Sequence, residues 1–90
     1  MSKVLHLTLK KIWFDQIFSG EKTIEYREIK PHWIKRLEET HGYDYIHFVN
    51  GYGKDKPWMD VEMRGIVKDR EKGEFCIHLG KVLRSGNING

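Results

Sequence analysis

The stretch VLHLTLKKIWFDQIFSGEKTIEYR, residues 4–27, decides the fold because its hydrophobic period changes twice. Over residues 4–9 leucines alternate with other residues, as in a strand with one buried face. Over residues 12–18 apolar side chains recur four apart, which indicates a short helix, and Gly20 provides its end. Over residues 22–29 the alternation returns. The stretch therefore predicts a strand, a helix and a second strand.

The rest of the chain predicts one more helix and three more strands. Pro31 suits the first turn of a helix, and Gly42 is its expected end. Trp33, Ile34 and Leu37 form the apolar stripe of this helix. The three remaining strands are expected at residues 45–49, 59–67 and 75–79.

The resulting order, β-α-β-α-β-β-β, predicts an α+β domain in which strands outnumber helices. A small, partly closed β-barrel with two short helices packed on it satisfies these elements, and a split α+β sandwich is the alternative. In the fourth strand we expect Met59 and Val67 on one face and a bulge at Gly65. We expect one domain over residues 1–84 and a flexible tail over residues 85–90.

Length and composition restrict the class of protein further. Ninety residues, of which 39% are hydrophobic and 12% aromatic, are enough for one core. The sequence has neither an apolar run long enough to span a membrane nor the pattern of a secretory signal, so we expect no membrane partner. The single cysteine, Cys76, cannot form an internal disulfide, which favours the cytoplasm. Residues 1–36 carry eight Lys/Arg and four Asp/Glu, an excess that can attract a phosphate backbone or simply be a solvated surface.

The segment from Gly20 to Arg27 holds the residues that point to chemistry. Glu25 and Arg27 are two apart on the predicted strand and project to the same face, with Lys22 near its start. Glu25 can hold Arg27 in a bidentate fork that presents the guanidinium to a phosphate or a base edge, or accept from an exocyclic amine. It can also act as a general base beside an oxyanion that Lys22 stabilises. The alternative without a function is a cross-strand salt bridge.

Several motifs of this chain occur together in one known family. After the first helix, Gly20, Lys22, Glu25 and Arg27 form the pattern Gly-x-Lys-x-x-Glu-x-Arg. The other motifs are LHLTLK at residues 5–10, WF at 13–14, YREIKPxW at 26–33, FxNGYG at 48–53 and IxLG at 77–80. With these motifs the sequence resembles the ASCH family, and in particular its compact members from phages and prophages of low-GC bacteria.

The resemblance implies a PUA-like barrel that binds RNA in a cleft between the first helices and the sheet and regulates translation or transcription. Lys22, Glu25 and Arg27 would line that cleft. One branch of the family hydrolyses the acetyl amide of N4-acetylcytidine with a lysine, a threonine and a glutamate on a helical insertion. Lys22 matches the lysine, Glu25 stands where the threonine would be, and the turn predicted around Gly73 leaves no insertion. Ribonuclease activity has been attributed to other members.

Further residues complete the expected binding surface. The turn NGYGK, residues 50–54, could approach a ligand closely, stack Tyr52 on an unpaired base and place Lys54 at a phosphate, although a plain hairpin turn has the same sequence. Trp33 is a candidate for the cleft rim, whereas Trp13 is expected in the core. The predicted binding residues are Lys22, Thr23, Glu25, Arg27, Lys30, Trp33, Asn50, Tyr52 and Lys54.

We expect no cofactor and no metal ion. The five histidines and Cys76 lack the paired spacing of a structural zinc site. Three functions stay open: a module that binds RNA or a nucleotide, a hydrolase that acts on an acetylated nucleoside or on RNA through Lys22 and Glu25, and a phage-encoded module that binds a host protein. A monomer or a weak dimer would suit each of them.

Overall fold

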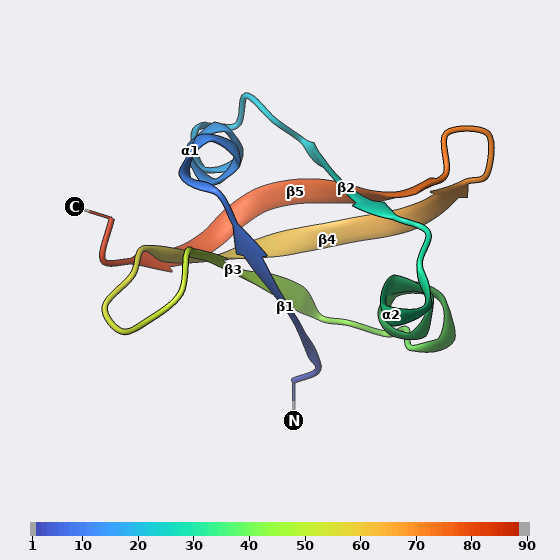
Figure 1. Cartoon of the computed structure of the whole chain (residues 1–90). Coiled ribbons are helices and arrows are strands. Elements are labelled where there is room, and N and C mark those ends of the chain that lie inside the picture. Colours follow the sequence, from blue (N-terminus) through green and yellow to red (C-terminus); the bar gives the residue numbers. More distant parts are fainter. Residues whose placement is uncertain (1, 89–90) are drawn as a thin grey trace.

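The structure, a computed structural model, describes residues 2–88 as five strands and two helical segments (Figure 1). The elements are β1 Val4–Leu9, α1 Lys11–Ser19, β2 Ile24–Glu28, α2 Pro31–Ile34, η1 Lys35–Glu39, β3 Tyr45–Asn50, β4 Trp58–Asp69 and β5 Glu74–Gly86. This confirms the α+β class and the predicted order of strands and helices. Among residues 2–88, no helix is long and apolar enough to cross a membrane.

The five strands form one curled sheet in the order β1-β3-β4-β5-β2. β1 and β3 are parallel, whereas the other neighbouring strands are antiparallel. β1 and β2 are therefore the two edge strands. Figure 1 shows both of them in front of β4 and β5, with α1 and α2 at opposite ends of the sheet. The sheet is thus a half-closed barrel with an open side between β1 and β2.

The core fills the inner face of this sheet, and four of the five strands contribute apolar side chains to it. The buried apolar residues are Leu5, Leu7, Leu9, Phe14, Ile17, Leu37, Ile46, Phe48, Met59, Val61, Phe75, Ile77 and Leu79. The three leucines of β1 confirm the predicted alternation. β2 is the exception, because its one buried side chain is the carboxylate of Glu25. A charged group therefore stands where the other strands have core residues.

The two helices begin as predicted, and one of them ends differently. α1 is closed by Gly20, whose positive φ of 86° suits glycine. The second helix begins at Pro31 but ends before Gly42. Its last turn, η1, is a π-helix in which the Thr40 N–H donates to the Lys35 carbonyl at 3.0 Å. Thr40 itself is extended (φ −107°, ψ 128°), so no further turn forms.

Bulges in β4 change which side chains face the core. The pairing of β4 with β5 shifts three times between Asp60 and Gly65, and the last shift falls at the bulge predicted for Gly65. Beyond it Val67 is exposed, while Ile66 packs against the core. The prediction that Val67 shares a face with Met59 was wrong, because simple alternation does not continue through a bulge.

The last strand is longer than predicted. β5 continues to Gly86, and its residues Ser85 and Gly86 pair with Met59 and Trp58 of β4. These two residues, which the sequence assigns to a flexible tail, therefore belong to the sheet, since β4 is long enough to pair with them. The predicted tail residues 89–90 lie outside the described residues.

Candidate functional site

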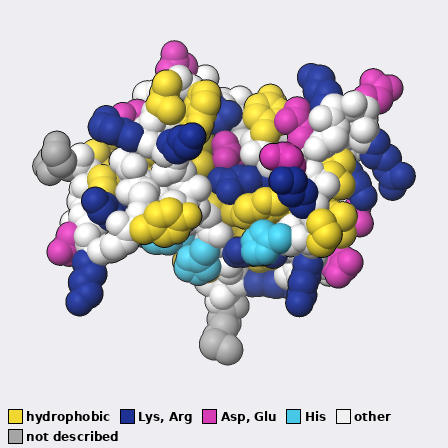
Figure 2. Space-filling view, in the orientation of Figure 1, with side chains coloured by type: hydrophobic (Ala, Val, Ile, Leu, Met, Phe, Trp, Pro, Cys, Tyr) yellow, Lys and Arg dark blue, Asp and Glu magenta, His cyan; other side chains and the backbone are white. Residues whose placement is uncertain are grey.

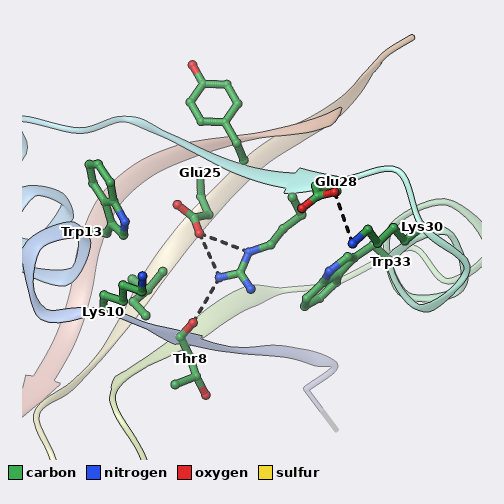
Figure 3. Close-up of a pocket in the computed structure, with 10 residues that line it drawn as sticks. Thr8, Lys10, Trp13, Glu25, Glu28, Lys30 and Trp33 are labelled. Atoms are coloured by element: carbon green, nitrogen blue, oxygen red, sulfur yellow. Dashed lines mark hydrogen bonds and ion pairs between the residues drawn. The ribbon is translucent and has the colours of Figure 1, made fainter. Parts of the chain in front are cut away.

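The two edge strands face each other across a gap, which we call the seam, and an arginine of β2 bridges it. Arg27 donates from Nη2 to the carbonyl oxygen of Thr8 on β1 at 3.2 Å. The same guanidinium donates from Nε and Nη2 to Oε2 of Glu25, at 3.1 and 2.8 Å. Figure 3 shows the guanidinium between Glu25 and Thr8. A side chain thus joins β1 and β2, which are not neighbours in the sheet.

Glu25 is buried, with 6% of the residue exposed, although it is an acid. Arg27 holds its Oε2, and Lys22 Nζ lies 3.8 Å from its Oε1. Two neighbouring cations offset much of the cost of removing a carboxylate from water. Because Arg27 occupies Oε2, only Oε1 remains for another donor. The two-residue spacing of Glu25 and Arg27 correctly predicted that their side chains share a face.

A hollow of about 510 Å³ opens over this ion pair. In Figure 3, Trp13 and Trp33 lie on opposite sides of the guanidinium. Lys10 lies on the side of Trp13, and Lys30 lies on the side of Trp33. Arg27 Cζ is 4.9 Å from the centre of the Trp33 ring, within the range of a cation–π interaction. Figure 2 shows basic and acidic groups together between apolar side chains on this face. The residues that line the hollow are Thr8, Leu9, Lys10, Trp13, Glu25, Tyr26, Arg27, Glu28, Lys30 and Trp33.

Trp13 lies in the wall of this hollow and not in the core, so its predicted role was wrong. α1 buries Phe14 and Ile17, and Trp13, one position earlier on the helix, turns to the edge of the core and stays 42% exposed. Its ring centre is 5.2 Å from Lys22 Nζ. The ring of Tyr26 is 4.9 Å from the same ammonium. Lys22 is therefore held between two aromatic rings.

The Lys22 ammonium contacts aromatic rings, but its distance to a carboxylate is long. Its side chain is only 16% exposed, yet the nearest carboxylate oxygen, on Glu25, is beyond hydrogen-bond distance at 3.8 Å. Within residues 2–88 its ammonium donates no hydrogen bond. It faces a smaller hollow of about 350 Å³, which Trp13, Lys22, Glu25 and Tyr26 line. An ammonium in this position can take up a carbonyl or phosphate oxygen.

The structure gathers only part of the predicted binding surface. Lys22, Glu25, Arg27, Lys30 and Trp33 lie in or beside the two hollows, and Thr23 lines a third one next to Lys22. Asn50 ends β3 and lines a separate hollow beside α1. Tyr52 and Lys54 are exposed in the loop that follows, outside these hollows.

Six of the residues that line the hollow were not predicted from the sequence as binding residues: Thr8, Leu9, Lys10, Trp13, Tyr26 and Glu28. Lys10 is an exposed residue between β1 and α1, and its position directly after an alternating strand could have suggested an edge. Thr8 takes part through its backbone carbonyl, which any residue would supply. No feature of the sequence could therefore have identified Thr8.

Comparisons with family models, curated proteins and solved structures find no match for this chain. Within the part of the chain that the structure describes, no group of three or more His, Cys, Asp or Glu side chains is placed to share a metal ion. The function must therefore be inferred from the geometry of the hollow and from the sequence motifs.

Proposed function

We propose that the protein is an RNA-binding module of the ASCH type, a PUA-like barrel whose cleft is the hollow at the seam. One observation carries the proposal: two exposed lysines, Lys10 and Lys30, flank a hollow with Trp13 and Trp33 in its walls. Proteins commonly hold single-stranded RNA with this combination, because aromatic rings stack on bases and lysines neutralise phosphates. A role in translation or transcription would follow from the resemblance alone.

Arg27 is the group best prepared to recognise a base in this hollow. Its Nε and Nη2 are held by Glu25 and Thr8, while Nη1 forms no hydrogen bond with any residue in 2–88. A guanidinium that is already fixed loses little conformational entropy when it donates to a base edge. Trp33 covers one side of the Arg27 guanidinium, and a nucleobase can stack on the other side.

The test measures the binding of a short single-stranded RNA by fluorescence anisotropy. The double variant Lys10→Ala/Lys30→Ala removes the two cations that flank the hollow without touching the seam. We expect at least a tenfold loss of affinity and a decrease of about 1.4 in the slope of log affinity against log salt concentration, since each phosphate contact on a single strand contributes about 0.7.

The matched control is Lys72→Ala/Lys81→Ala, which removes the same charge at exposed positions away from the hollow. It should leave the affinity within about twofold, because a distant charge on the surface is screened by salt. An equal loss in both double variants would remove the hollow as the binding site. Failure of the native protein to bind RNA would remove the proposed function.

A second candidate is a hydrolase of acetylated nucleosides, which the free ammonium of Lys22 favours. Water would attack the acetyl carbonyl carbon while Glu25 Oε1 takes a proton from it and Lys22 stabilises the oxyanion. The bond between this carbon and N4 would then break, the proton would pass from Glu25 to N4, and cytidine and acetate would leave. We would then expect turnover of N4-acetylcytidine that Lys22→Met abolishes. A flat time course at high protein concentration, with the acetylated nucleoside and with single-stranded RNA, would exclude a hydrolase.

A further inference from the structure

The outer face of the sheet carries a row of polar side chains across four strands. Arg84 of β5 is the pairing partner of Asp60 of β4, and Asp60 is the partner of His47 of β3. His47 is in turn the partner of His6 of β1. Because side chains alternate along a strand, these four lie on the face opposite the core. We call them the outer row.

Asp60 fixes the arrangement of the outer row. Its side chain is only 8% exposed, and both of its oxygens are bonded. Oδ1 lies 2.6 Å from His47 Nδ1, and Oδ2 accepts from Arg84 Nε at 2.9 Å. A carboxylate only accepts, so Nδ1 of His47 donates this hydrogen bond, and Nε2 lies on the opposite edge of the ring.

An aromatic ring and the guanidinium of Arg84 lie near this histidine. The Trp58 ring stacks on His47, with ring centres 5.3 Å apart. Trp58 lies against β5 at Gly86, where a Cβ atom would collide with the indole. Arg84 donates to Asp60 from Nε only, so Nη1 and Nη2 can donate to other acceptors. The hydrogen bond that Arg84 donates to Asp60 raises the pKa of the guanidinium above its ordinary value.

His6 places the outer row next to the hollow. It lies two residues from Thr8 on β1, a distance of about 7 Å along a strand. Thr8 both lines the hollow and accepts from Arg27. A strand that leaves the hollow over β1 would therefore meet the outer row next.

We propose that the outer row is a second RNA contact, in which a ribose 2′-hydroxyl forms a hydrogen bond with His47 Nε2 while Arg84 holds a phosphate and a base stacks on Trp58. This inference rests on the proposed function and deepens it, because it names single-stranded RNA and not DNA as the ligand. The 2′-hydroxyl is the group that distinguishes the two nucleic acids at a given site.

The test compares the affinities of RNA and DNA oligonucleotides of one sequence, about ten nucleotides long. We expect the native protein to prefer RNA at least fivefold. His47→Phe keeps a ring against Trp58 but removes Nε2, so it should weaken RNA binding alone and bring the preference to about onefold. His78→Phe, a matched change on β5 outside the outer row, should keep the native preference.

A second measurement needs no variant and therefore does not depend on the folding of His47→Phe. RNA with a single 2′-deoxy nucleotide at successive positions should bind the native protein several-fold more weakly at one or two positions only. Uniform affinity along this series, or a preference for RNA that survives in His47→Phe, would overturn the outer row as an RNA contact.

The outcomes also separate the two proposals. If the native protein binds RNA and DNA equally and Lys10→Ala/Lys30→Ala weakens both, the hollow remains the binding site and the outer-row contact is overturned. If the native protein binds neither nucleic acid, both proposals are overturned together.

Discussion

The seam and the outer row each contain a buried acid held by an arginine, but the two acids occupy opposite kinds of place. Glu25 and Asp60 are both 6% exposed, and their arginines approach to 2.8 and 2.9 Å. Glu25 stands between β1 and β2, which form no backbone ladder with each other. Asp60 stands on β4, whose backbone is already paired on both sides. The first pair therefore closes the fold, whereas the second only orients side chains on a sheet that is fixed without it.

The two arginines differ in exposure and in the partners that they contact. The side chain of Arg27 is 17% exposed, whereas that of Arg84 is 54% exposed. Arg27 donates to both strands of the seam, whereas Arg84 donates to Asp60 and lies over the ring of Tyr45. Removing one partner of a buried ion pair is costly, because the charge that remains is shielded from water. An ion pair with one hydrated partner costs less to break.

The largest expected effect is the loss of stability in Arg27→Ala. This variant leaves Glu25 buried with only Lys22 nearby, at 3.8 Å, and opens the contact with Thr8. We expect the free energy of unfolding in urea to fall by about 3 kcal/mol. The double variant Glu25→Leu/Arg27→Met should recover most of this loss, since it leaves no unpaired charge in the seam. A loss below about 1 kcal/mol would show that the seam does not depend on the ion pair.

Asp60→Ala applies the same test of stability to the outer row. It removes the acid but leaves behind two groups, His47 and Arg84, that can both reach water. We therefore expect a smaller loss, of about 1–2 kcal/mol in the same urea titration. Nitrogen-15 spectra should also show that His47 Nδ1 has lost its hydrogen bond. A loss as large as that of Arg27→Ala would contradict the distinction between the two sites.

The extent to which the sequence predicts these two sites also differs. Glu25 and Arg27 are two apart, so their common face follows from the period of a strand. Their partner on β1 is the backbone carbonyl of Thr8, which any residue type would supply. Whether this carbonyl comes within reach of Arg27 depends on how far the sheet curls. His6 and His47 are 41 positions apart, and only the register of β1 with β3 brings them together. The bulges of β4, which made the prediction for Val67 wrong, likewise depend on pairing between strands.

Gly86→Ala tests the outer row through packing instead of charge. An added Cβ would stand 2.6 Å from Trp58 Cε2, and a rigid indole must then move off His47. We expect a loss of about 1 kcal/mol. In the control, Gly80→Ala, the added Cβ meets the carboxylate end of Glu62, which is flexible and can turn to solvent. Calorimetric melting of both variants checks this prediction. Equal losses of stability would show that the position of Trp58 does not depend on the lack of a side chain at Gly86.

The smallest expected effect concerns the thiol of Cys76. The acids near it, Glu74 and Asp69, form no ion pair with an arginine in residues 2–88. Cys76 lies on the outer face of β5, where burial first and then the charges of Glu74 and Asp69 raise the pKa of the thiol above its ordinary value of 9.0. A raised pKa means less thiolate at any given pH, so iodoacetamide should react with the folded protein several-fold more slowly than with the urea-unfolded chain at pH 8.5. The rate should still be rising at pH 9, because half-ionisation lies beyond it. A rate that reaches its plateau below pH 8.5 would mean that a cation dominates this site, and the contrast with the two arginine-held acids would then not hold.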